Sequence, residues 1–286
     1  MKKYRQSLLI FFVAISMILS ACSGTATTAA PTTAPTTAAV EPTVTEVPPT
    51  ATVEPTVEPS PTAIPEASAS DLDAAYGTFL SSMKAYNTIN LEAFNEALME
   101  DPKPFNLDVR EVSEAEEKGH IEGAVLIPLR ELAQHVDLLP SFDTPILSYC
   151  GSGWRCTIAM TALEALGWTD VKCLKDNSFT GWVDAGYPVV EGVPVDAEPL
   201  NAAQPDPALL AAIDKMLQAI PAGFGGIAAD ALNTALVENP DLILVDVRTA
   251  KEVEEQGSID AVNVINIPLE EFVAKRDMWT WDMDTP

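Results

Sequence analysis

Residues 146–167 read ILSYCGSGWRCTIAMTALEALG. The first four residues of this stretch are a short apolar run suited to a buried strand. Residues 157–166 place apolar side chains at helical spacing and are followed by Gly167, a residue that commonly ends a helix. A glycine-rich turn that contains Cys150 separates the two. Because a strand that passes through a short turn into a helix is typical of α/β sheets, we predict that architecture here.

The segments on either side continue the alternation of helices and strands. Residues 91–99 have the pattern of an amphipathic helix, whereas residues 105–109, 125–127 and 171–174 are short apolar runs typical of strands. Strands that alternate with helices at this spacing form parallel sheets. The expected fold class is therefore α/β, with a parallel sheet that has helices on both faces.

The folded part of the chain contains an internal repeat. Residues 89–121 align without a gap with residues 227–259, and both copies contain Asp-Val-Arg, at 108–110 and at 246–248. A solenoid would use shorter and more numerous repeats, so two copies at this spacing predict two similar domains in tandem.

We place the first domain at residues 71–198 and the second at residues 199–286. The second copy ends in Asp-Thr-Pro at 284–286, and the same triplet in the first copy, at 143–145, comes shortly before Cys150. We therefore expect that the second domain is truncated and that the sequence is a fragment. A counterpart of Cys150 would lie beyond its last residue.

The first residues have the pattern of an export signal. A basic start precedes the apolar run at 8–19, which is too short for a permanent membrane-spanning helix. The predicted signal ends with Leu19-Ser20-Ala21-Cys22, which resembles the lipobox of bacterial lipoproteins. This resemblance implies that residues 1–21 are removed and that Cys22 is lipidated. We therefore expect an extracytoplasmic protein, anchored to the bacterial cell membrane through Cys22.

A tether follows the predicted signal. Residues 25–70 consist largely of Thr, Pro and Ala with scattered Glu, and they contain no aromatic and no basic residue. Such a stretch cannot bury enough apolar area to offset its chain entropy. We expect residues 22–70 to be a lipid-anchored, disordered tether.

Composition excludes several classes of function. The chain has 16 basic and 42 acidic side chains and a net charge of −26, which argues against a nucleic-acid partner because phosphate binding needs clustered Lys and Arg. Four cysteines are too few for a disulfide scaffold. No metal-ligand spacing and no dinucleotide-binding motif occur, so we predict neither a metal nor a cofactor.

The turn after residues 146–149 is the candidate site. Its glycines let the backbone curl so that amide groups can face an anion at the start of a helix. A helix N-terminus and a nearby arginine both favour the thiolate form of a cysteine, which makes Cys150 the candidate nucleophile. Arg155 offers a charged fork suited to an oxyanion. Trp154 is expected either to form a wall of the pocket or to pack on its own helix.

Other polar and sulfur-containing residues are interpreted as structural. Asp108 and Arg110 recur in the second copy, which favours an ion pair that supports the fold over a catalytic role. Cys156 is expected to pack at the start of the helix, although it could capture an oxidised Cys150. Cys173 alternates within a strand and is predicted to be a core residue.

Three motifs together resemble the rhodanese-type sulfurtransferases. Asp-Val-Arg at 108–110, with residues 119–124 and 127–128, resembles the first signature of that family, and residues 174–189 resemble its closing signature. The spacing of Cys150 and Arg155 resembles its active-site loop, which has four residues between Cys and Arg. The resemblance covers about residues 86–192 and part of a second copy from about residue 224.

The resemblance implies a sulfurtransferase in which Cys150 takes a sulfane sulfur from a small donor as a persulfide. The sulfur then passes to a thiol or to cyanide. The Cys-Gly-Ser-Gly opening is similar to the 3-mercaptopyruvate branch, whereas the closing arginine is more typical of thiosulfate users, so both donors stay open. The residues implied to bind the substrate or persulfide are Gly151, Ser152, Gly153, Trp154 and Arg155.

Two alternatives stay open at this point. The domain could be a non-catalytic binding module or a persulfide carrier. It could also be a phosphatase or an arsenate reductase of a related fold, but those loops have one more residue between Cys and Arg.

Overall fold

A computed structural model of the chain describes residues 66–279 and residue 281. The predicted signal, Cys22 and most of the predicted tether lie outside these residues. The strands in the part predicted as the first domain are β1 (Thr88–Ile89), β2 (Phe105–Asp108), β3 (Ala124–Leu126), β4 (Ile146–Tyr149) and β5 (Val171–Leu174). Its helices are α1 (Ala69–Ser82), α2 (Leu91–Ala97), α3 (Val112–Lys118), α4 (Trp154–Leu166) and α5 (Ser178–Asp184), with 3-10 segments η1 (Ala85–Asn87) and η2 (Leu129–Leu138).

The five strands form one sheet in the order β1-β5-β4-β2-β3, and every pairing in it is parallel. β4 lies at the centre, with Leu107 of β2 opposite Ser148 and Cys173 of β5 on the other side of Ser148. All four residues of β4 are buried, as expected for the central strand of a covered parallel sheet. The carboxyl ends of β2 and β4 therefore meet at one edge of the sheet.

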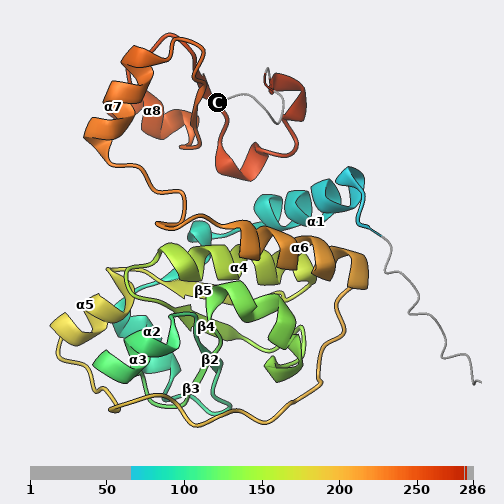
Figure 1. Cartoon of the computed structure of the whole chain (residues 1–286), viewed down its shortest axis with the longest axis vertical. Helices are drawn as coiled ribbons and strands as arrows, with labels where there is room; N and C mark the ends of the chain where they lie inside the picture. Colours follow the sequence, from blue (N-terminus) through green and yellow to red (C-terminus); the bar gives the residue numbers. More distant parts are fainter. Residues whose placement is uncertain (1–65, 280, 282–286) are drawn as a thin grey trace, which may run out of the picture. The chain divides into compact units, whose positions relative to one another are not determined.

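Alternate side chains of β4 enter two separate cores. Ile146 packs in a cluster with residues of α1, α4, η2 and α6 (Pro207–Ala219), and Cys150, just beyond the strand, lies in the same cluster. Leu147 and Tyr149 belong to the second cluster, with Phe94 of α2 and residues of α5. Figure 1 shows these two layers on opposite sides of the sheet. The predicted α/β fold with helices on both faces is confirmed.

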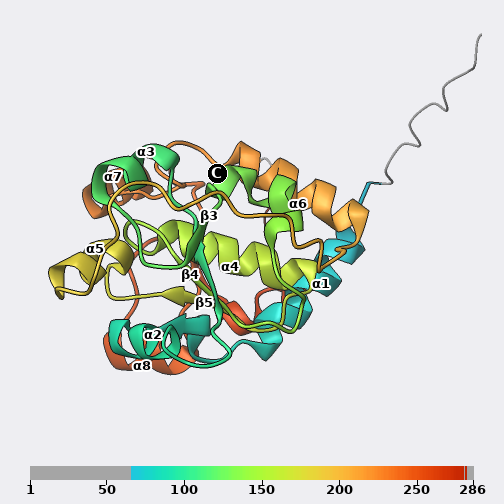
Figure 2. The ribbon, with the colours of Figure 1, turned by 90° about the horizontal axis from the view of Figure 1, so that it is seen from below.

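Helix α4 is covered on its outer side as well as by the sheet. Eight of its 13 residues are buried, which is typical of a helix surrounded by other elements. α1 and α6 both contact α4, and Figure 2 shows them on either side of it. The helix ends at Gly167, which adopts a left-handed conformation. Since α4 is fixed along its length, its first turn provides a rigid base for the Cys150 loop.

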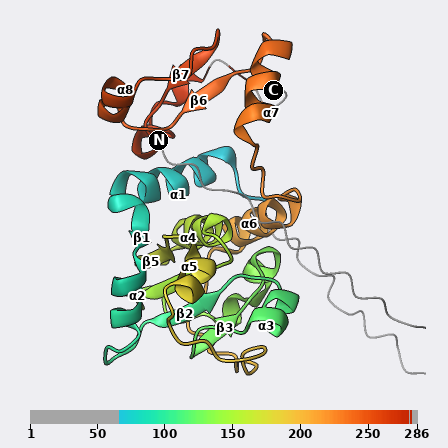
Figure 3. The same ribbon diagram turned by 90° about the vertical axis from the view of Figure 1, so that its left-hand side faces the viewer.

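The rest of the described chain contains α7 (Ala229–Glu238), β6 (Leu244–Asp246), α8 (Ala250–Gln256), β7 (Val264–Asn266), η3 (Leu269–Glu271) and η4 (Arg276–Met278). β6 and β7 form a parallel pair beside α7 and α8 (Figure 3). The order strand, helix, strand repeats that of β2, α3 and β3. That this segment belongs to a second domain of the same fold stays a prediction. Within residues 66–279, no helix is long and apolar enough to cross a membrane.

Candidate active site

Cys150 directly follows β4 at the carboxyl edge of the sheet. Its residue surface is 1% exposed. Its amide donates a hydrogen bond to Ser178 Oγ at 3.0 Å, and its carbonyl accepts one from the Phe179 amide at 2.9 Å. Both partners lie in α5, which begins after β5. The backbone of the candidate nucleophile is therefore fixed by the element that follows the neighbouring strand.

The turn at residues 151–153 curls around the sulfur atom. The Gly153 amide donates to Cys150 Sγ at an N–S distance of 3.1 Å. Gly153 has a φ of 109°, a conformation that favours glycine, and α4 begins at the next residue. The Gly151 carbonyl accepts from the Thr180 amide at 3.1 Å and from its hydroxyl at 2.9 Å. The sulfur thus faces the N-terminal end of a 13-residue helix, where a negative charge is favoured.

Arg155 does not present a free fork. Both of its terminal nitrogens pair with the carboxylate of Glu114 on α3, with an Nη2–Oε1 distance of 2.7 Å, and Arg155 is only 9% exposed. Burial lowers the pKa of Arg155, but the hydrogen bond and charge of Glu114 outweigh it and raise that pKa. In the structure a glutamate of the chain occupies this fork, and the expectation that Arg155 binds a substrate oxyanion stays a prediction.

Sequence reasoning missed Glu114, although a signal was present. The Glu111 amide donates to Glu114 Oε2 at 3.0 Å, which is the spacing of a capping box at the start of α3. The second copy has the same box at Thr249 and Glu252. Because α3 follows β2, a residue in its first turn lies at the carboxyl edge of the sheet, close to the loop that follows β4.

Two aromatic side chains lie near the Cys150 loop. Trp154 is 60% exposed, and its ring lies beside the segment at residues 221–226, because a Cβ added at Gly226 would meet it at 3.6 Å. The ring centroid of Phe224 in that segment lies 5.4 Å from Cζ of Arg155 and 5.2 Å from Cζ of Arg130. The ring of Trp154 is thus largely exposed, and its role as a wall of the pocket stays a prediction. Phe224 belongs to no motif of the sequence, so its position near Arg155 could not be predicted.

Asp108 and Arg110 form a buried ion pair at the end of β2. The Nη2–Oδ2 distance is 2.6 Å and both side chains are at most 1% exposed. Arg110 also donates to the Gly119 carbonyl at 2.8 Å, and its Cζ lies 3.9 Å from the ring centroid of Phe179. These contacts connect β2, the end of α3 and α5. The pair therefore supports the elements that carry the loop. The Arg110 side chain donates its hydrogen bonds to Asp108 and to the Gly119 carbonyl.

The remaining cysteines form a pair. Cys156 in the first turn of α4 and Cys173 in β5 are joined by a disulfide, and among the described residues Cys150 is the free cysteine. The expectation that Cys156 and Cys173 are separate packing residues is corrected: both are buried, but they are bonded to each other. The bond attaches the start of α4 to the strand next to β4.

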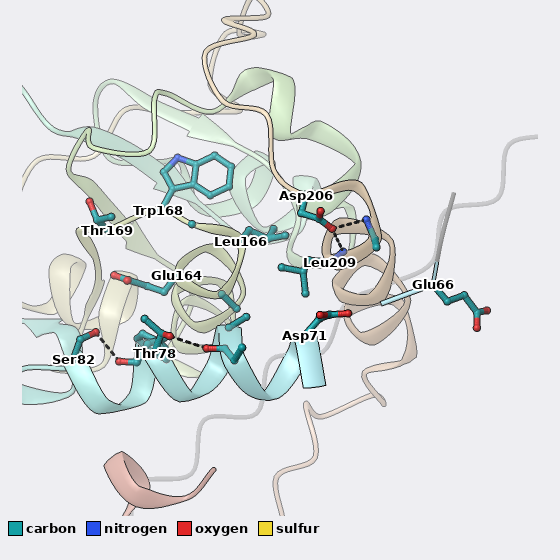
Figure 4. A pocket seen from close by; sticks show the side chains of 16 residues that line it. Glu66, Asp71, Thr78, Ser82, Glu164, Leu166, Trp168, Thr169, Asp206 and Leu209 are labelled. Carbon is teal, nitrogen blue, oxygen red and sulfur yellow. Dashed lines mark hydrogen bonds between the residues drawn. The ribbon is translucent and has the colours of Figure 1, made fainter. Parts of the chain in front are cut away.

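A cavity lined by other residues lies away from the Cys150 loop. It has a volume of about 740 Å³ and is lined by residues of α1, α4 and α6. Four of its lining residues are acidic, namely Glu66, Asp71, Glu164 and Asp206 (Figure 4). Burial raises the pKa of Glu164, whose Oε1 accepts from the Val171 amide at 3.0 Å. None of the residues of the Cys150 loop lines this cavity.

Known proteins resemble this part of the chain. Residues 92–185 match the family described as rhodanese-like domain. The 3-mercaptopyruvate sulfurtransferase of Escherichia coli (strain K12) is 32% identical over 104 residues, which cover 31% of this chain and 37% of that protein. The putative sulfur carrier protein YrkF of Bacillus subtilis (strain 168) is 39% identical over 83 residues, covering 29% of this chain and 44% of that protein.

Among solved structures, a rhodanese-related protein from Thermoplasma volcanium is 30% identical with a TM-score of 0.33, covering 37% of this chain and 98% of that one. The thiosulfate sulfurtransferase of Pseudomonas aeruginosa is 23% identical with a TM-score of 0.38, covering 72% of this chain and 38% of that one. The chain spans less than half the length of these two curated relatives. Residues 92–185 of this chain are thus a rhodanese-like domain with sulfurtransferase homologues at low identity.

Proposed function

We propose that the protein is a sulfurtransferase that holds a sulfane sulfur on Cys150 as a persulfide. The observation that carries this proposal is the position of Cys150 Sγ. It lies at the end of the central strand, accepts the Gly153 N–H at 3.1 Å and faces the start of α4. A thiolate or persulfide anion is stabilised by such a site. The similarity to a 3-mercaptopyruvate sulfurtransferase supports the same assignment.

The reaction proceeds in two transfers. With thiosulfate, the Cys150 thiolate attacks the sulfane sulfur, the S–S bond of thiosulfate breaks, and sulfite leaves with the electron pair. With 3-mercaptopyruvate, the C–S bond breaks instead, and the enolate that leaves takes a proton to become pyruvate. In the second transfer, an acceptor thiolate or cyanide attacks the outer sulfur of the persulfide. This step breaks the S–S bond and returns the Cys150 thiolate.

The loop residues have separate parts in this scheme. Gly151, Ser152 and Gly153 supply the backbone that curls around the outer sulfur, and Trp154 forms the exposed side of the entry. Arg155 keeps a positive charge in the first turn of α4, held there by Glu114. The intermediate needs no cofactor, because the sulfur atom itself is the group transferred.

Mass spectrometry of the intact protein tests the proposal. After incubation with either donor, the wild type is expected to gain the mass of one sulfur atom, and subsequent cyanide is expected to remove it as thiocyanate. Cys150→Ser is expected to show neither change. A gain of mass that persists in Cys150→Ser would contradict the role of this residue.

Two further outcomes would replace the proposal. A persulfide that forms once, without catalytic turnover, would identify a sulfur carrier; the Bacillus subtilis relative is named a putative sulfur carrier protein. Rapid hydrolysis of an aryl phosphate, lost in Cys150→Ser, would identify a phosphatase. The four residues between Cys150 and Arg155 argue against that reaction, because they leave less room for a tetrahedral oxyanion.

We also propose that the protein is a lipoprotein outside the cytoplasm, on the basis of Leu19-Ser20-Ala21-Cys22. A disulfide between Cys156 and Cys173 supports this location, because disulfides persist in oxidising compartments. Cells fed a labelled fatty acid are expected to label the wild type. Loss of the label in Cys22→Ser would support the proposal, and an unlabelled wild type in the soluble fraction would contradict it.

A further inference from the structure

The carboxylate of Glu114 lies directly over the Cys150 loop. A Cβ added at Gly151 would stand 3.1 Å from Arg155 Nη2 and 3.5 Å from Glu114 Oε1. Gly151 is the residue next to the candidate nucleophile. The ion pair of Glu114 and Arg155 is therefore part of the immediate surroundings of the reacting sulfur.

Glu114 stays ionised in this position. Partial burial alone raises its pKa, but the hydrogen bonds from Arg155 and from the Glu111 amide outweigh that effect and hold the pKa below its usual value. The pair therefore brings one positive and one negative charge to the loop. A second arginine, Arg130 of η2, has its Nη1 atom 3.7 Å from Oε1 of Glu111. Each of these two arginines is matched by a glutamate, so neither brings an unpaired positive charge to the surroundings of the loop.

The faces of the Arg155 guanidinium are restricted too. Its two terminal nitrogens point at Glu114, and the ring of Phe224 lies 5.4 Å from its Cζ. A donor with two negative charges close to its transferable sulfur would have to displace Glu114 or approach its carboxylate. Like charges brought together in a partly buried site cost free energy.

We propose that Glu114 is a specificity-determining residue that disfavours dianionic sulfur donors at Cys150. Glu114 fills the Arg155 fork, and the site accepts donors that carry a single remote carboxylate, such as 3-mercaptopyruvate, in preference to thiosulfate. This inference rests on the proposed sulfurtransferase function and names its donor class. The transfer step is the one already written, with pyruvate rather than sulfite as the product.

The alternative explanation is that Glu114 only caps α3. In the second copy, Glu252 has the capping contact with Thr249, so capping alone explains a glutamate at this position. A glutamine also serves in a capping box. Glu114→Gln therefore keeps the cap and removes the charge. Glu117→Gln, on the exposed side of the same helix, removes one charge without touching Arg155 and is the matched control.

The first measurement is alkylation of Cys150 by iodoacetate and by iodoacetamide, which differ mainly in charge. In Glu114→Gln the ratio of the iodoacetate rate to the iodoacetamide rate is expected to rise about tenfold, since a unit charge within a few ångströms is removed. Glu117→Gln is expected to leave the ratio unchanged. An unchanged ratio in Glu114→Gln, in a variant that melts like the wild type, overturns the inference.

The second measurement compares donors. The ratio of kcat/KM for thiosulfate to kcat/KM for 3-mercaptopyruvate is expected to rise about tenfold in Glu114→Gln, mainly through a lower KM for thiosulfate. Equal changes for both donors would mean that Glu114 acts only on the position of Arg155. If no persulfide forms on the wild type with either donor, the sulfurtransferase proposal fails. The alkylation ratio, which needs no sulfur transfer, still reports on the charge of Glu114.

Discussion

Two ion pairs with the same residue types show how burial changes the contribution of an ion pair to stability. Asp108 and Arg110 are at most 1% exposed, whereas Asp246 and Arg248 have the same hydrogen bonds but are 13% and 34% exposed. Removal of one partner from a buried pair leaves a charge without water or counterion. A half-exposed pair is instead screened by solvent. Identical sequence motifs therefore have different energetic roles in the two copies.

Asp108→Asn is expected to lower the free energy of unfolding by about 3–5 kcal/mol, because it leaves the Arg110 charge buried. Asp246→Asn, the matched change in the second copy, is expected to cost much less. Urea denaturation followed by circular dichroism measures both. Equal losses in the two variants would show that burial does not distinguish the pairs.

Residue order predicts the candidate nucleophile but not its neighbours. Cys150 and Arg155 are close in sequence, so the turn between a strand and a helix brings them together. Glu114 precedes Arg155 by 41 residues and reaches it only because α3 begins at the edge where β4 ends. Phe224 comes from a segment after the domain. Such contacts depend on tertiary packing, which no local pattern contains.

At the scale of elements, the strands were predicted best. Residues 171–174 form β5 with the predicted bounds, because a short apolar run between turn residues allows little else. The helix predicted at 157–166 begins three residues earlier, at Trp154, since its first turn starts directly after the loop glycine. The pairing of Cys156 with Cys173 was missed, because it depends on which side of α4 faces β5.

The disulfide is expected to stabilise the domain through the segment it closes. Cys156 and Cys173 are 17 residues apart, and closing a loop of that size contributes about 3 kcal/mol. A Cys156→Ala/Cys173→Ala variant is expected to melt about 5–10 °C below the wild type. Dithiothreitol is expected to shift the wild type toward the variant and to leave the variant unchanged. A reductant effect of equal size in both proteins would show that the bond does not account for the difference.

At the scale of the whole molecule, the segment after α6 connects the two copies and also contacts the candidate site. Arg130 donates to the carbonyls of Ile220 at 3.1 Å and Pro221 at 3.3 Å, which holds the start of this segment against the first domain. Gly226 then lies beside Trp154. A segment that the predicted bounds place in the second domain therefore lies beside Trp154 and Arg155 of the Cys150 loop.

Phe224 is the residue of this segment with the clearest consequence. It has a φ of 59° between two glycines at 82° and 73°, a left-handed conformation that costs a residue with a Cβ about 1–2 kcal/mol. Phe224→Ala and Phe224→Gly both remove the ring over Arg155, so both are expected to speed alkylation of Cys150 by N-ethylmaleimide more than by the smaller iodoacetamide. Only the glycine variant also removes the backbone cost, so it is expected to be more stable than the alanine variant by about 1 kcal/mol. Faster alkylation in one variant alone would mean that strain, rather than the ring, controls access, because the two variants differ only in their backbone preference.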